Sequence, residues 1–548
     1  TLTIPRLPEL VDIQSRNYTV WPFSMSAEDT DLLSTLEQRR ALLAAPGQQE
    51  LLRDIRRGIE KESLRMDAGG LLARTPHPAA FGSALCHPSI TTDFSEALLE
   101  FITPVSESIT DTLEELERIH RFAARSIGDE LLWNASMPCH LPAADDIPVA
   151  QYGSSHSATM KTRYRLGLGH RYGRKMQTIA GIHYNFSLPP ALWAVLNDGN
   201  ADKDTITDGY FGLIRNFRRY SWLLIYLFGA APAVSSCFVN GQSHALTKTG
   251  EHTLYGPYAT SLRMGDLGYQ SNAQKNLNIC YNHLDYYIDT LRGAITTSHS
   301  DYERFPGDEQ LSSGLLQIEN EFYSPIRPKR VTASGEIPLG ALRRGGVEYI
   351  EVRCLDVNPL LPLGIDAQQI RFLDAFLLFC LCADSPLCDD DANSSIADNL
   401  SKVVNRGREP GLMLCDTEGQ ARSLSDWGDA LLDDIAQFAE ILDAAHGESR
   451  YIESCATQRA KLRNPVLTPS AQIVDAILNR DGGYHPFALR LSQQHSKTLR
   501  DAPLLPSEIH RFADLREDSM EQQAEMEASN QGGFDDYLTR FYEQYQTL

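Results

Sequence analysis

Acidic side chains at alternate positions are the first sign of chemistry in this sequence. In RRGIEKESLRM, residues 56–66, Glu60 and Glu62 stand on either side of a lysine. Successive side chains of a β-strand point to opposite faces, so the two carboxylates would share one face and repel each other. Lys61 would point to the other face, and we therefore do not expect it to be a ligand.

Four further segments carry notable polar side chains when each is read with period two. Three place them at alternate positions, and in one Asp93 precedes a run in which Glu100 interrupts apolar residues. The four are TTDFSEALLEFITP (91–104) with Asp93 and Glu100, GIHYNFSLP (181–189) with His183 and Asn185, LQIENEFY (316–323) with Gln317, Glu319, Glu321 and Tyr323, and GVEYIEVRCL (346–355) with Glu351 and Arg353. For a single strand, an antiparallel sheet with one solvated face explains the pattern. Together the five faces are dominated by carboxylates, whereas a solvated face usually mixes Lys, Thr, Ser and Glu and so limits like-charge pairs.

This set of residues predicts a site for a hard divalent cation. Mg²⁺ prefers carboxylate oxygens, and a neutral imidazole is tolerated as a ligand. Converging carboxylates raise one another's pKa unless cations compensate them, and bound Mg²⁺ keeps coordination positions for water and substrate phosphates. The predicted chemistry is phosphoryl transfer from ATP, in which catalysis depends on positioning and charge neutralisation.

Basic residues near these segments have two interpretations each. Arg353 would suit a developing phosphoryl charge, or it forms a salt bridge with Glu351. Arg327, Lys329 and Arg330 follow LQIENEFY closely and would clamp nucleotide phosphates, or they belong to a solvated basic loop. The residues alone leave both questions open.

Bulk properties argue against several classes of protein. The chain has 548 residues and a net charge of −22, which argues against nucleic acid or an anionic membrane as the main partner. The ten cysteines form no C-x-x-C pair, and there is no P-loop, protein-kinase signature or H-E-x-x-H motif.

The most apolar stretch, residues 222–234, is shorter than the roughly 20 residues of a spanning helix, and we expect it to be buried. With no signal-peptide region at the N-terminus, we expect a cytoplasmic protein.

The order of patterns along the chain predicts an α+β protein. Residues 1–24 show weak periodicity and are interpreted as a flexible N-terminal extension. Alternating strand-like and helical runs predict a catalytic core over 25–425, followed by a helical region packed on it over 426–548. In that region Thr468 and Pro469 are expected to begin a helix that Gly482 can close, and residues 518–533 read as a solvated surface helix.

Long motifs in the core resemble one enzyme family. The segments RRGIEKESLR, TTDFSEALLEFITPV, QTIAGIHYNFSLP, PYATSLRMGDLGY, LQIENEFYSPIRPKR and RGGVEYIEVRCLDVNP are similar to the γ-proteobacterial class of glutamate–cysteine ligase. The resemblance runs from about residue 50 to 400 and continues more weakly into the helical tail. One departure is WNASMPC (133–139), where Asn134 and Ala135 replace the Pro-Leu of related sequences.

The resemblance implies a reaction and a fold. ATP would phosphorylate the γ-carboxylate of L-glutamate, and the amine of L-cysteine would attack the γ-glutamyl phosphate to give γ-glutamylcysteine, the first step of glutathione biosynthesis. The core would be similar to glutamine synthetase, with a curved, mainly antiparallel sheet forming a funnel that holds Mg²⁺, or Mn²⁺ in its place. Because this route needs no enzyme nucleophile, no catalytic cysteine is expected. Feedback inhibition by glutathione and a monomeric state are further expectations.

The family's site residues can be carried over position by position. The metal positions are Glu60, Glu62, Asp93, Glu100, His183, Asn185 and Glu351. Arg353 matches an arginine near the transferred phosphoryl group, and we expect it to act with Glu351 and Glu60 in catalysis. Amino-acid substrate contacts fall on Arg263 and Tyr269, on Tyr164, Leu168 and Gln177 around the cysteine pocket, and on Tyr323. Arg327, Lys329 and Arg330 are the candidates for nucleotide phosphates.

Two alternatives accompany this reading. The chain could be another carboxylate–amine ligase of the same superfamily that uses a different amine acceptor. It could also be a non-catalytic regulatory relative, although the intact set of acids with His183 and Arg353 argues against that.

Overall fold

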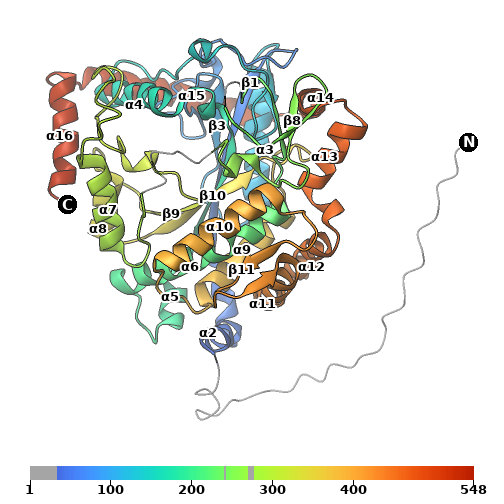
Figure 1. Ribbon diagram of the computed structural model, residues 1–548. Helices are drawn as coiled ribbons and strands as arrows, with labels where there is room; N and C mark the ends of the chain where they lie inside the picture. The colour runs from blue at the N-terminus through green and yellow to red at the C-terminus, as the bar shows by residue number, and fades with distance from the viewer. Residues whose placement is uncertain (1–33, 240–241, 269–273, 275–276) are drawn as a thin grey trace, which may run out of the picture.

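An open antiparallel sheet lies at the centre of the structure (Figure 1). The computed structural model describes residues 34–239, 242–268, 274 and 277–548, and the extension predicted at 1–24 lies outside the described residues. The strand order is β2-β3-β1-β5-β10-β9, and β4 also pairs with β1. The strand bounds are β1 Arg56–Met66, β2 Ile90–Thr92, β3 Leu98–Ile102, β4 Leu131–Trp133, β5 Gly181–Ser187, β9 Ile326–Lys329 and β10 Tyr349–Asp356. The predicted α+β class with a mainly antiparallel sheet is confirmed.

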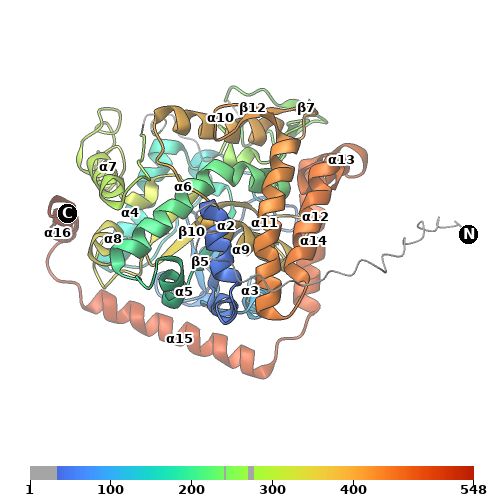
Figure 2. The ribbon, with the colours of Figure 1, turned by 90° about the horizontal axis from the view of Figure 1, so that it is seen from below.

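Helices cover the sheet and make up the C-terminal region (Figures 1 and 2). Their bounds are α2 Thr35–Ala44, α3 Ile109–Ser126, α4 His156–Tyr172, α5 Pro190–Leu196, α6 Lys203–Phe228, α7 Leu284–Thr296, α8 Pro338–Gly345, α9 Ala367–Cys382, α10 Asp390–Arg406, α11 Leu424–His446, α12 Arg450–Arg463, α13 Pro469–Asn479, α14 Tyr484–Asp501, α15 Pro506–Ala528 and α16 Phe534–Gln546. Small sheets are formed by β6 Ala233–Ser235, β8 Thr253–Tyr255 and β7 Thr247–Thr249, and by β11 Met413–Cys415 and β12 Ala421–Ser423. The predicted helical region is present, whereas the division of the chain at 425 stays a prediction.

Local sequence signals set several of these helices. Thr468 caps α13 by accepting a hydrogen bond from the Ala471 amide, and Pro469 is its first residue, as predicted. The helix ends at Asn479, before Gly482. The apolar residues of 222–228 end α6 and are buried, and none of the described helices is long and apolar enough to cross a membrane.

One predicted strand is wrong. The segment LQIENEFY forms a loop with a 3₁₀ turn at Glu319–Glu321 instead of a strand. Both glutamates are buried: Glu319 accepts hydrogen bonds from the Leu339 amide at 3.0 Å and from the Tyr545 hydroxyl, and Glu321 accepts one from the Gln317 amide at 2.7 Å. Their alternate spacing therefore reflects two anchors for a loop and not one face of a sheet.

The sheet has one polar and one apolar face. Ile59, Tyr184 and Val352 point to the apolar face and are fully buried, as the period-two patterns predict. On that face the buried Arg57 and Asp374 of α9 form an ion pair at 3.1 Å, and the Tyr184 hydroxyl donates to Asp374 at 2.5 Å. The pair ties α9 to strands β1 and β5.

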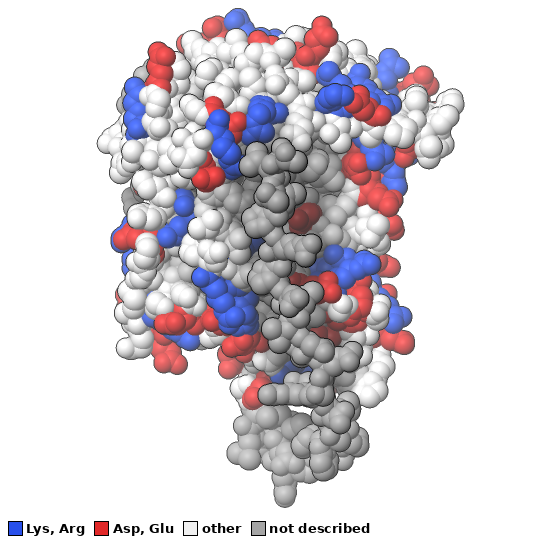
Figure 3. All heavy atoms as spheres, turned by 90° about the vertical axis from the view of Figure 1, so that its right-hand side faces the viewer, with Lys and Arg blue, Asp and Glu red and all other residues white. Residues whose placement is uncertain are grey.

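Both signs of charge are interspersed on the surface that Figure 3 shows, where Lys and Arg side chains lie among Asp and Glu side chains. Helix α15 also lies at the surface (Figure 2), and most of its side chains are exposed, as predicted for residues 518–533. It ends at Ala528 and contacts α3. The helix therefore combines a solvated face with a packed one.

Lys61 points away from the acidic face, as predicted, and is buried. Its Nζ lies 2.9 Å from His120 Nε2 and donates to Asn134 Oδ1 at 2.9 Å. Asn134, the departure noted in WNASMPC, therefore provides an acceptor for this lysine. No carboxylate among the described residues forms a salt bridge with Lys61, and burial lowers its pKa to about 7.

The buried lysine predicts a pH dependence of stability. Between about pH 7 and pH 10 the unfolded chain binds a proton at Lys61 that the folded chain does not bind, so the free energy of unfolding should rise with pH. Replacing Lys61 by Met removes this contribution. We expect the increase from about pH 7 to pH 10, measured by urea unfolding, to be about 3 kcal/mol larger in the native chain than in Lys61→Met. Equal increases would show that the lysine stays protonated when buried.

Candidate active site

Strand register brings the predicted acidic residues together. Glu60 of β1 lies opposite His183 of β5, and Glu62 of β1 lies opposite Glu100 of β3. Glu351 of β10 lies opposite Asn185 of β5. Side chains at directly opposed positions of an antiparallel pair lie close together on one face. Four separate chain segments therefore build one acidic floor.

Three of these side chains are arranged as a metal site would require. One ligand atom each of Glu60, Glu100 and His183 lies within 4.8 Å of the others. His183 Nδ1 lies 3.0 Å from Glu60 Oε2, and its Nε2 is buried without a hydrogen-bond partner. Asn185 donates to Glu60 Oε1 at 2.9 Å, while its own side-chain oxygen is buried and unpartnered. Two carboxylates and two unsatisfied buried acceptors fit the donor set of a hard divalent cation.

Burial and mutual repulsion raise the pKa values of two carboxyl groups of the floor. Burial, together with the charges of Glu60 and Asp93, raises the pKa of Glu100 well above its usual range. Burial and Asp93 raise the pKa of Glu62 to about 8, although a hydrogen bond from the Gly181 amide opposes this. Bound cations would relieve both shifts, because an opposite charge favours the ionised carboxyl group.

Two cations, Lys329 on the neighbouring strand β9 and Arg353 on β10 itself, hold Glu351 ionised. Burial opposes ionisation, but Lys329 and Arg353 outweigh it and keep the pKa of Glu351 well below its usual range. Arg353 Nη1 lies 3.1 Å from Glu351 Oε2, and Lys329 Nζ lies 3.5 Å from Glu351 Oε1. The salt bridge proposed for Arg353 from sequence is present, and Arg353 also lines the cavity above the floor.

A register shift in β10 sets the position of Arg353. Val352 pairs with Tyr184, whereas Leu355 pairs with Ile182, so β10 carries one more residue than β5 over this interval. Such a bulge bends the strand and redirects the side chains within it. Arg263 donates to the Arg353 carbonyl at 2.7 Å within the bulge.

A cavity of about 410 Å³ opens over the floor. Its acidic lining consists of the floor residues Glu60, Glu62, Asp93, Glu100 and Glu351 and of Glu319 and Glu321 from the neighbouring loop. Its basic lining consists of Lys161, Arg165, Arg327, Lys329 and Arg353. The predicted contacts Tyr164, Leu168, Gln177 and Tyr323 line another side, where Gln177 Nε2 donates to the Tyr323 hydroxyl at 2.9 Å. The cavity thus joins an acidic floor, a cationic wall and a mixed aromatic and amide wall.

Some predicted residues lie elsewhere. Arg263 is fully buried behind the cavity, 3.7 Å from Asp356, and Asn185 lies beside Glu60 outside the lining. Arg330 donates to the Gly346 carbonyl at 2.6 Å and pairs with Glu348, also outside the lining. Arg327 lines the cavity, but its guanidinium group donates to the Asn320 carbonyl at 2.9 Å. Tyr269 lies outside the described residues.

Other lining residues were not found from the sequence. Lys161 and Arg165 lie on α4, each three residues before one of the predicted contacts Tyr164 and Leu168. Residues three apart are neighbours on a helix surface, so this spacing would have suggested both. Burial lowers the pKa of Lys161 to about 8. Phe541 reaches the cavity from the C-terminal helix α16, and no motif around it predicts that contact.

Comparisons with known proteins find related chains. The model of the glutamate–cysteine ligase family matches residues 41–403. The chain is 51% identical over 521 residues to glutamate–cysteine ligase of Pseudomonas paraeruginosa, which covers 93% of this chain and 98% of the relative. It is 50% identical over 522 residues to that of Azotobacter vinelandii, with the same coverage.

Solved structures agree with the sequence relatives. Glutamate–cysteine ligase of Francisella tularensis, solved in complex with AMP, matches with a TM-score of 0.85 and 36% identity over 90% of this chain and 98% of that one. A bifunctional glutathione synthetase of Pasteurella multocida matches with a TM-score of 0.68 and 27% identity over 85% of this chain and 55% of that one.

The fold and these relatives therefore define an enzyme of the ligase class. Because the family model and the relatives cover most of the chain, the chain belongs to the glutamate–cysteine ligase family. The resemblance carried by the sequence motifs is confirmed, and with it the joining of glutamate to cysteine as the first step of glutathione biosynthesis.

The raised pKa of Glu100 predicts opposite effects of one substitution with and without metal. The raised pKa of Glu100 destabilises the folded state at neutral pH, and Glu100→Gln removes this cost, so in the presence of a chelator its thermal unfolding midpoint should exceed that of the native chain. The native midpoint should rise when Mg²⁺ is added in excess, because a bound cation stabilises the folded state, and this rise should be lost in the variant. The exposed Glu418→Gln variant is the control and should keep the native response. A full Mg²⁺ response in Glu100→Gln would remove Glu100 from the metal site.

Proposed function

We propose that the cavity over the acidic floor is the site where ATP activates the γ-carboxylate of glutamate for attack by the amine of cysteine. The observation that carries this proposal is that Glu60, Glu100 and His183 come together in a cavity that a cationic wall also lines. Phosphoryl transfer needs both, because charge moves from the nucleotide to the acceptor carboxylate during the step.

The acidic floor would hold Mg²⁺, with Mn²⁺ as an alternative ion. Glu60, Glu100 and His183 are the central candidates, and Glu62, Asp93, Asn185 and Glu351 surround them. Bound Mg²⁺ would supply charge neutralisation for the phosphates of the nucleotide. The unpartnered His183 Nε2 and the repelling carboxylates support this assignment.

The cationic wall would bind phosphate oxygens. Arg353 and Lys329 are held next to Glu351 and line the cavity, so their positive charges can face an anion without moving far. Arg353, aimed by the bulge, would stabilise the charge on the transferred phosphoryl group. Arg327 would contribute its charge from a more fixed position, while Arg330 and Arg263 would act from outside the lining.

The wall formed by Tyr164, Leu168, Gln177 and Tyr323 would bind the amine acceptor. It combines a small apolar surface with a hydroxyl and an amide that already hydrogen-bond each other, which suits a small amino acid. We call these four residues the acceptor pocket. Tyr269 would contribute to substrate binding as the family resemblance implies.

Four further assignments belong to this proposal. The catalytic core would comprise residues 25–425 and the helices of 426–548 would pack on it. The enzyme would act as a cytoplasmic monomer. Glutathione would inhibit by feedback, because it contains the γ-glutamylcysteine unit that the site produces.

The proposal predicts how ATP cleavage depends on substrates. With Mg²⁺, ATP and glutamate, ADP release should depend strongly on added L-cysteine. L-2-Aminobutyrate should replace cysteine less well, because the amine and not the thiol attacks the acyl phosphate. A coupled assay of ADP with each acceptor in turn measures this. A large preference for ammonia or for another amino acid would contradict the assigned acceptor.

A further inference from the structure

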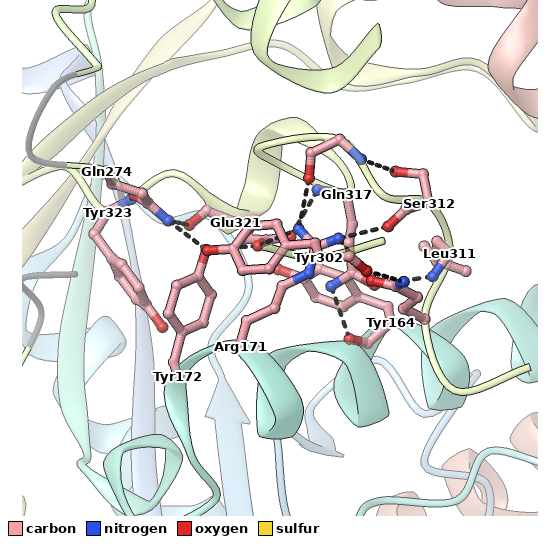
Figure 4. Close-up of polar contacts among 12 residues, drawn as sticks. Tyr164, Arg171, Tyr172, Gln274, Tyr302, Leu311, Ser312, Gln317, Glu321 and Tyr323 are labelled. Atoms are coloured by element: carbon pink, nitrogen blue, oxygen red, sulfur yellow. Dashed lines mark hydrogen bonds and ion pairs between the residues drawn. The ribbon is translucent and has the colours of Figure 1, made fainter. Parts of the chain in front are cut away.

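A buried ion pair joins helix α4 to the loop that carries Glu321 (Figure 4). Arg171 Nη1 lies 3.0 Å from Glu321 Oε1, and neither side chain is exposed. Arg171 also donates to the Gly314 carbonyl at 3.0 Å, to Gln310 Oε1 at 3.0 Å and to the Ser312 carbonyl at 2.5 Å. One guanidinium group therefore fixes four points of the loop over residues 310–321.

Glu321 has further donors. The Tyr172 hydroxyl donates to its Oε1 at 2.6 Å, and the Gln317 amide donates to its Oε2 at 2.7 Å. Gln274 Nε2 lies 3.0 Å from both the Tyr172 oxygen and the Glu321 carbonyl. Gln274 Oε1 then accepts from the Tyr323 amide at 3.2 Å, so the network ends at a residue of the acceptor pocket.

One face of α4 belongs to both the network and the acceptor pocket. Residues 164, 168, 171 and 172 have the spacing i, i+4, i+7 and i+8, which places their side chains on one side of a helix. Tyr164 and Leu168 line the cavity, and Arg171 and Tyr172 hold the opposite wall. Gly167 lies on α4 beside Leu168, and a Cβ there would come within 2.2 Å of Gln317 Oε1, so the loop contacts the helix closely.

The loop depends on these side chains for its position. Its described residues 310–323 belong to no strand, and their only regular element is the turn at Glu319–Glu321. Five of them line the cavity, namely Ile318, Glu319, Asn320, Glu321 and Tyr323. A shift of the loop would therefore move one wall of the acceptor pocket away from the other.

We propose that Arg171 and Glu321 are positioning residues that set the affinity for the amine acceptor. This inference rests on the assignment of the acceptor pocket under Proposed function. The pair fixes the distance between Tyr164 and Leu168 on α4 and Tyr323 on the loop. Breaking it leaves a buried charge without an opposite charge, which favours movement of the loop toward solvent.

The test separates acceptor binding from the other kinetic constants. Glu321→Gln keeps the shape of the side chain, and it should raise the KM for cysteine by about tenfold or more, since small misplacements of a binding group are costly. The KM values for ATP and glutamate should stay within about twofold of native, because the proposed function places their reacting groups over the floor and the cationic wall. Arg171→Lys keeps the positive charge and should raise the KM for cysteine less than Glu321→Gln does.

A milder variant tests the same contact in case Glu321→Gln fails to fold. Tyr172→Phe removes one hydroxyl that donates to Glu321, so we expect a smaller rise in the same KM in a chain that folds normally. Asp374→Asn is the matched control, because it breaks a different buried ion pair on the apolar face of the sheet. It should lower the thermal unfolding midpoint without a selective change in the KM for cysteine.

Gln177→Ala tests the acceptor pocket itself and should raise the KM for cysteine. If it does and the Arg171, Tyr172 and Glu321 variants do not, the positioning role is overturned and the pocket assignment stands. If Gln177→Ala leaves that KM unchanged, the pocket assignment fails. A uniform change in all constants, matched by Asp374→Asn, would also overturn the inference, since it would reduce the pair to a structural role.

Discussion

Repulsion between carboxylates on one strand face is the constraint on which the rest of the structure depends. Glu62 and Glu100 are directly opposed across β1 and β3, and Glu60 and Asp93 add to the repulsion at Glu100. Like charges at opposed positions destabilise a sheet. The acidic floor can therefore persist only if other parts of the fold keep β1, β3, β5 and β10 in register.

The opposite face of the sheet supplies that stability. Apolar side chains such as Ile59 and Val352 are fully buried there, and the Arg57–Asp374 pair connects the strands to α9. Burial of apolar area contributes about 25 cal/mol per Å², so a continuous core offsets a local electrostatic cost. A one-residue slip in β1 would place Lys61 on the floor and the glutamates in the core, and register is fixed for that reason.

Alternation of side chains made much of this candidate site predictable. The features that could not be predicted depend on tertiary contacts. Side chains on one face of a strand recur at every second position of the sequence, and this spacing identified Glu60, Glu62, His183 and Glu351. The bulge at Arg353 leaves no such mark, because it depends on how two strands pair. Phe541 reaches the cavity through the packing of a C-terminal helix, which local patterns do not encode.

The prediction that failed shows how two kinds of carboxylate differ. Glu319 and Glu321 repeat the alternation of Glu60 and Glu62, yet each already accepts hydrogen bonds from groups of the chain. Glu100 has no hydrogen-bond donor among the described residues, and its pKa is raised well above the usual range. A buried carboxylate that accepts hydrogen bonds from its own chain holds a loop in place. A carboxylate without such donors in a buried acidic cluster can instead bind a cation. Spacing identifies both kinds, and the fold separates them: Glu319 and Glu321 hold a loop through hydrogen bonds, whereas Glu100 lies among other carboxylates.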